Sequence, residues 1–162
     1  MTARRSASAR DPQRKPPSRG GRPWVLVDTN IFFLVFSSAF PLETLVRERL
    51  PEARIGVPAG VLGELDRLTE KGEPNALSAR KFAMRYPRIA HTGRGDIGIL
   101  RAARRHRGYV VTSDRALVRR LRDQGTTVFV PRDRARLELL PGRSPARRPA
   151  RPRRRERFND RR

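Results

Sequence analysis

Short apolar runs alternate with amphipathic stretches along residues 24–143, and this alternation constrains the fold most. The predicted strands cover residues 24–28, 54–58, 89–92, 109–112 and 127–130. The predicted helices cover residues 31–36, 41–50, 59–71, 75–86, 95–106 and 114–124. Strands separated by helices are typical of βαβ units, which build parallel sheets covered on both faces. The sequence therefore predicts an α/β fold, with three α/β/α layers and a central, mostly parallel sheet.

Both ends of the chain differ in composition from this middle part. Residues 1–23 and 144–162 are rich in arginine and proline and contain too few apolar side chains to build a core. We expect one domain over residues 24–143, flanked by a disordered basic arm and a disordered Arg-rich tail.

The chain is strongly basic, with a formal net charge of +22. The two arms carry +6 and +7, so +9 remains on residues 24–143. A GC-rich genome would also favour the 35 arginines over the three lysines, but the net charge itself indicates a polyanionic partner, most often nucleic acid.

Several classes of protein are excluded or disfavoured by what the sequence lacks. There is no cysteine, which excludes disulfides and Cys-ligated metal sites. The two histidines, His91 and His106, receive no predicted role. The longest apolar run, residues 31–36, is far shorter than a membrane span, and the basic N-terminus lacks the apolar segment of a secretory signal. We expect a cytoplasmic protein with no membrane association.

Two aspartates follow predicted strands. Asp28 ends the first strand, and Asp114 lies two residues after Thr112, which ends another. Ligands of open α/β sheets bind beyond the carboxyl ends of the strands. A lone aspartate in either place is commonly only a turn residue or a helix cap.

Helical periodicity adds a direction to two of the acids. Asp114 shares an apolar stripe with Leu117, Val118 and Leu121, and Asp96 heads a similar stripe with Ile99, Leu100 and Ala103. We therefore expect both acids to begin a helix on its core-facing side. Inward carboxylates repel one another and lose hydration unless a cation neutralises them, so the pattern indicates a Mg²⁺ or Mn²⁺ site.

A fourth acid is less sharply placed. In the helix predicted at 59–71, Glu64 lies at one edge of the apolar stripe and Asp66 at the other. The periodicity does not choose between them, and either could be an ordinary solvated side chain.

Four short motifs then occur in order. They are Val25-Leu26-Val27-Asp28-Thr29-Asn30, Val61-Leu62-Gly63-Glu64-Leu65, Gly95-Asp96 and Val111-Thr112-Ser113-Asp114. Together they resemble the motifs of the PIN-domain nucleases over roughly residues 24–140. The resemblance assigns Asp28, Glu64, Asp96 and Asp114 to the acidic quartet of that family. It assigns Thr29, Asn30, Thr112 and Ser113 to the positions that orient these acids.

Within that family, the chain is most similar to archaeal relatives of the PIN endonuclease that processes ribosomal RNA in the small-subunit processome. The supporting segments are Arg136-Leu137-Glu138-Leu139-Leu140-Pro141 and Gly93-Arg94-Gly95-Asp96. One position departs from that branch, which often has a second acid directly after the third, because Ile97 stands there. If the alignment were shifted by one residue, Ile97 would take the third acidic position and the site would lack one of its four acids.

The resemblance implies metal-dependent hydrolysis of RNA phosphodiester bonds and a role for each acid. One or two Mg²⁺ or Mn²⁺ ions would be held mainly by Asp28 and Asp114 and completed by Asp96, with Glu64 as a ligand or as an orienting group for metal-bound water. Candidate RNA contacts are Arg94, Arg115 and Arg119. The expected partner is ribosomal precursor RNA, and a homodimer is plausible for the family.

Two other functions stay open. One is a VapC-like toxin ribonuclease, which would pair with an antitoxin. The other is a non-catalytic RNA-binding ribosome assembly factor that kept the fold, for which the Ile97 departure leaves room. The arginine-rich arms favour the processing enzyme over a toxin, and the intact acids argue against a non-catalytic factor.

Overall fold

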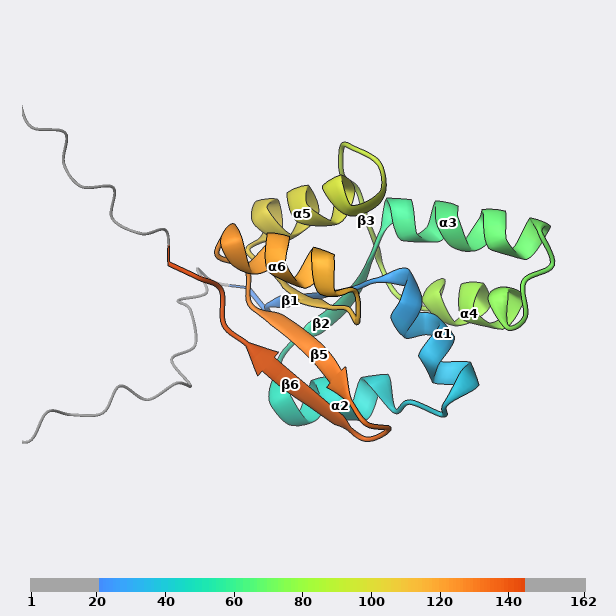
Figure 1. Cartoon of the computed structure of the whole chain (residues 1–162), viewed down its shortest axis with the longest axis horizontal. Coiled ribbons are helices and arrows are strands. Elements are labelled where there is room, and N and C mark those ends of the chain that lie inside the picture. Colours follow the sequence, from blue (N-terminus) through green and yellow to red (C-terminus); the bar gives the residue numbers. More distant parts are fainter. Residues whose placement is uncertain (1–20, 145–162) are drawn as a thin grey trace, which may run out of the picture.

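The computed structural model describes residues 21–144, so the predicted arms at 1–23 and 144–162 fall outside the described residues except for 21–23 and 144. Six strands and six helices occur within this described part (Figure 1). The strands are β1 (Trp24–Val27), β2 (Arg54–Pro58), β3 (Arg88–Ile89), β4 (Tyr109–Val111), β5 (Val128–Arg132) and β6 (Arg136–Leu140). The helices are α1 (Thr29–Ser37), α2 (Leu42–Arg49), α3 (Ala59–Glu70), α4 (Ala76–Ala83), α5 (Gly95–His106) and α6 (Arg115–Asp123).

The strands form one sheet in the order β3-β2-β1-β4-β5-β6. Every neighbouring pair is parallel except β5 and β6, which are antiparallel. In Figure 1, α5 and α6 lie above the sheet and α2 lies below it, while α1, α3 and α4 pack together at the right. This arrangement confirms the predicted α/β class and the mostly parallel central sheet.

The sixth strand corrects the predicted strand list, which ended at residue 130. Strand β6 pairs with β5 over five residue pairs, from Val128 with Leu140 to Arg132 with Arg136. The connecting turn contains no glycine, the usual sequence signal of a hairpin. Asp133 instead adopts a φ of 49°, and its side chain accepts a hydrogen bond from the Ala135 amide. An aspartate can serve in this way because its short side chain bonds the local backbone.

The centre of the sheet is fully enclosed. Residues Val25–Val27 of β1 are 0% exposed, as are Val110 and Val111 of β4. A strand buried on both faces needs apolar side chains on both sides, which explains why these segments are continuous apolar runs. The ends of β1 and β4 are therefore held rigidly by the core, and side chains that follow them start from fixed positions.

No single helix within residues 21–144 is long and apolar enough to cross a membrane, and only α1 together with α2, a pair bent by 119°, passes that test on length and composition.

Candidate active site

The candidate site lies where β1 and β4 end, side by side in the sheet. Strands β1 and β4 are neighbours in the sheet. After β1 the chain adds β2 and β3 toward one edge, and after β4 it adds β5 and β6 toward the other edge. Such a switch in direction leaves a crevice beyond the carboxyl ends of the two strands. Asp28 directly follows β1 and Thr112 directly follows β4.

Asp28 is the buried acid of the site, at 9% exposed. Its Oδ1 accepts a hydrogen bond from the Thr29 amide at 2.8 Å, and its Oδ2 accepts one from the Thr112 hydroxyl at 2.7 Å. Burial raises the pKa of Asp28 above its ordinary value of 3.8, these hydrogen bonds partly offset the rise, and the charges of Glu64 and Asp96 add to it. The carboxylate thus lies in a place where a negative charge is unfavourable without a nearby cation.

Two threonines connect Asp28 to other acids. The Thr29 hydroxyl donates to Glu64 Oε2 at 2.6 Å, while the backbone of the same residue binds Asp28. The Thr112 hydroxyl donates to Asp28 and accepts from the Asp114 amide at 3.1 Å. Each threonine therefore fixes two acidic positions relative to one another.

The structure separates Glu64 from Asp66, which helical periodicity left equivalent. Glu64 turns toward Thr29 and Asp28, whereas the Asp66 carboxylate pairs with the guanidinium of Arg80 on α4. Glu64 therefore faces the site and Asp66 faces the neighbouring helix.

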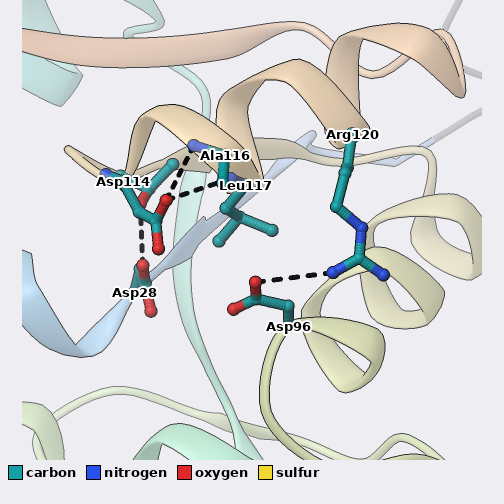
Figure 2. Close-up of polar contacts among 7 residues, drawn as sticks. Asp28, Asp96, Asp114, Ala116, Leu117 and Arg120 are labelled. Carbon is teal, nitrogen blue, oxygen red and sulfur yellow. Dashed lines mark hydrogen bonds and ion pairs between the residues drawn. The ribbon is translucent and has the colours of Figure 1, made fainter.

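Asp96 and Asp114 were expected to point inward, but neither is buried. The side chain of Asp96 is 41% exposed and pairs with Arg120 at 3.5 Å, and Asp114 is exposed. Asp114 Oδ1 accepts from the amides of Ala116 and Leu117 and so caps α6 (Figure 2). A helical wheel gives a direction around the axis but not the exposure at a helix end, and Asp96 lies in the first turn of α5 while Asp114 is the N-cap of α6.

The start of α1 also differs from the prediction. The helix was predicted over residues 31–36, but it begins at Thr29 and Asp28 is its N-cap. The Asn30 side chain instead donates to Asp28 Oδ2 at 3.3 Å and accepts from the Ser113 amide at 3.4 Å. Ser113 thus enters this network through its backbone.

Of residues 96 and 97, Asp96 is the better candidate for the third acidic position. Asp96 is close enough to Asp28 to raise its pKa, whereas the Ile97 side chain is 46% exposed. The three arginines proposed as RNA contacts are exposed, and within residues 21–144 none of them forms an ion pair. They lie at the start of α5 and along α6, namely Arg94, Arg115 and Arg119.

The oxygen atoms of the four acids have unused capacity for a cation. Each carboxylate oxygen can accept two hydrogen bonds. Within the described part of the chain, Asp28 Oδ1 receives one, and Glu64 Oε1, Asp96 Oδ1 and Asp114 Oδ2 receive none. Hard oxygen donors of this kind suit Mg²⁺ and Mn²⁺. The same residues 21–144 contain no three acidic or histidine side chains already close enough to hold an ion, so binding would require Asp96 and Asp114 to turn inward.

Periodicity missed two residues near the site. Arg120 reaches Asp96 from α6, a contact that depends on how two helices pack and leaves no local signal. His91 lies against the first turns of α3 and α5. The other histidine, His106, packs edge-on against Trp24 at the opposite end of β1, with ring centroids 6.5 Å apart.

We expect Glu64→Gln to lower the affinity for Mn²⁺ by roughly 10- to 100-fold, because it removes a charge that faces Asp28. Asp66→Asn, two residues away on the same helix, is the matched control and should keep the wild-type affinity, since its carboxylate faces Arg80. Calorimetric titration with Mn²⁺ would measure the difference, and equal affinities for the two variants would contradict this assignment.

A family model described as "PIN like domain" matches residues 25–134. A comparison with curated protein sequences finds no match. Among solved structures, the fold is similar to that of the PIN domain endonuclease Utp24, with a TM-score of 0.62, 24% identity, and coverage of 75% of this chain and 96% of that one.

A second similar structure is a domain of a functionally unknown protein from Methanocaldococcus jannaschii. Its TM-score is 0.54 at 17% identity, with coverage of 68% of this chain and 91% of that one. At such identities the two structures support the fold, while the family match covers most of the chain, including β1, α3 and the start of α6. The chain belongs to the PIN-like domain family.

Proposed function

We propose that this protein is a divalent-metal-dependent endoribonuclease that hydrolyses phosphodiester bonds. The observation that supports this most is the environment of Asp28, a carboxylate buried at a strand end with its pKa raised by burial and by two neighbouring acids. Burial of this carboxylate costs free energy that its hydrogen bonds offset only in part, and a bound cation would compensate the rest. Membership of a family that contains endonucleases such as Utp24 supports the same reaction class.

We assign a role to each of the four acids from its position. Asp28 and Asp114 would hold the ion most directly, because they follow adjacent strands and share the Thr112 hydroxyl. Asp96 would complete the site, and Glu64 would act as a ligand or orient water. Mg²⁺ or Mn²⁺ bound there would supply the positive charge that stabilises negative charge on the scissile phosphate.

The substrate we propose is RNA, and ribosomal precursor RNA in particular. The domain carries +9 over residues 24–143. The exposed side chains of Arg94, Arg115 and Arg119 leave guanidinium groups available for phosphate. The ribosomal role rests on the resemblance of residues 93–96 and 136–141 to the corresponding segments of the PIN endonucleases that process ribosomal RNA.

Removal of the metal provides the direct test. With purified protein and structured ribosomal-precursor RNA, we expect cleavage with Mg²⁺ or Mn²⁺ and none in EDTA, with recovery when the ion is restored in excess. DNA of the same sequence is the control for substrate class. Undiminished cleavage in EDTA would contradict the proposal. Tight RNA binding with no cleavage under any metal would instead indicate a non-catalytic RNA-binding factor.

A further inference from the structure

One histidine joins the two helices that carry Glu64 and Asp96. The ring of His91 accepts a hydrogen bond from the Gly60 amide, in the first turn of α3, through Nε2 at 2.9 Å. Its Nδ1 atom is buried and has no hydrogen-bond partner within residues 21–144. A buried polar atom without a partner is uncommon and calls for an explanation.

Helix α3 lacks a cap of its own. Its N-cap residue is Pro58, which makes no side-chain hydrogen bond to the helix. The first amides of a helix have no partner within the helix and need an acceptor from elsewhere. His91 supplies that acceptor from a position 31 residues further along the chain. An imidazole that accepts through Nε2 carries its proton on Nδ1, so this contact requires the neutral ring in one tautomer.

The adjoining edge of the ring, formed by Cε1 and Nδ1, lies directly on the backbone of α5. A Cβ atom added at Gly98 would lie 2.3 Å from His91 Cε1 and 2.6 Å from Nδ1. A Cβ at Gly60 would lie 3.2 Å from Cε1, whereas a Cβ at Gly63 would meet nothing within 4 Å. The ring therefore fits against α5 only because residue 98 is glycine, and a side chain at residue 60 would make its contact with α3 tight.

We propose that His91 is a positioning residue of the candidate active site, whose imidazole caps α3 and holds α5 at a fixed spacing from it. Glu64 follows Gly60 by one helical turn, and Asp96 precedes Gly98 by two residues. A shift at the start of either helix therefore moves an acid whose charge acts on Asp28. The contact at Nε2 orients the ring and leaves its Nδ1 atom without an acceptor within residues 21–144. The catalytic meaning of this spacing rests on the proposed function.

Two amide substitutions at His91 distinguish a side chain that caps α3 from one that only fills the space. In His91→Gln the amide reaches the place of Nε2, and in His91→Asn it reaches only the place of Nδ1. We expect His91→Asn to speed hydrogen exchange of the Gly60 amide, to shift the carboxyl ¹³C signals of Glu64 and Asp96, and to weaken Mn²⁺ binding by roughly 10- to 100-fold. His91→Gln should restore all three toward wild type. Wild-type ¹⁵N spectra should show the proton on Nδ1.

A glycine pair provides a second, independent variant set. Gly98→Ala should displace the ring and reproduce the loss in Mn²⁺ affinity, while Gly63→Ala, on α3 with open space around it, should not. In a His91→Ala background, Gly98→Ala should add little, because the two closest atoms are gone and only a 3.1 Å approach to the Gly93 carbonyl oxygen remains. Additive losses for these two substitutions would overturn the proposal.

The metal-free readout separates this inference from the proposed function. Should His91→Asn free the Gly60 amide yet leave the carboxyl signals of Glu64 and Asp96 and the Mn²⁺ affinity unchanged, His91 would be a local cap and the proposal would be wrong. Should wild type neither bind Mn²⁺ nor cleave RNA, the proposed function would fail, and the carboxyl signals of the metal-free variants would still decide whether His91 sets the spacing.

Discussion

Asp28→Asn is expected to lower metal-dependent RNA cleavage by at least about a hundredfold, since loss of a ligand should exceed the 10- to 100-fold effect of losing a group that only supports one. The substitution removes the charge of the most buried acid in the site while keeping its shape. Single-turnover cleavage with Mn²⁺ would measure the effect, beside circular dichroism to confirm the fold. Asp66→Asn is the control, and equal cleavage by wild type and Asp28→Asn would contradict the metal-site assignment.

The same variant should alter how stability depends on pH. Because the folded pKa of Asp28 is raised, the folded state favours the protonated acid. Its contribution to stability is therefore fully present below the unfolded pKa and is lost as pH rises through the folded pKa. We expect metal-free wild type to lose stability over that range and Asp28→Asn to lack this component. Urea unfolding in EDTA at several pH values would show it, and identical pH profiles would contradict the raised pKa.

Thr112→Val is expected to lower cleavage by roughly 10- to 100-fold and to destabilise the fold by about 1–3 kcal/mol. Thr112 is 0% exposed, and its hydroxyl contacts both Asp28 and the amide of Asp114. Valine keeps the volume but leaves a buried carboxylate oxygen with one donor fewer and the Asp114 amide without this acceptor. Kinetics of RNA cleavage and urea unfolding would measure the two effects separately.

Thr126→Val is the matched control for this substitution. Thr126 is also buried, and its hydroxyl accepts a hydrogen bond from the Gln124 side chain, away from the acids. It should lose stability on a similar scale and cleave RNA as wild type does. If the activity of Thr112→Val fell no further than that of Thr126→Val, the orienting role of Thr112 would be wrong.

Local sequence patterns predicted the fold more completely than they predicted the orientation of the side chains in the site. The apolar runs located β1 and β4 because strands buried on both faces contain little else. Strand β6 was missed because its turn uses Asp133 where glycine is the recognisable signal. The orientation of Glu64 depends on Thr29, which is 35 positions distant, and that of Asp66 depends on Arg80 on another helix. Contacts of this kind arise only when elements pack, so periodicity along one helix could not assign them.

The capping role of Asp114 complicates the use of alanine scanning at this position. Its Oδ1 satisfies two amides at the start of α6, and loss of such a cap costs typically about 1 kcal/mol. An Asp114→Ala protein would therefore fray its helix and lose a charge at once, and a loss of activity could not be divided between the two causes. Asp114→Asn retains an acceptor for the helix and removes only the charge. At a position that serves both folding and chemistry, the choice of replacement residue decides what the experiment can report.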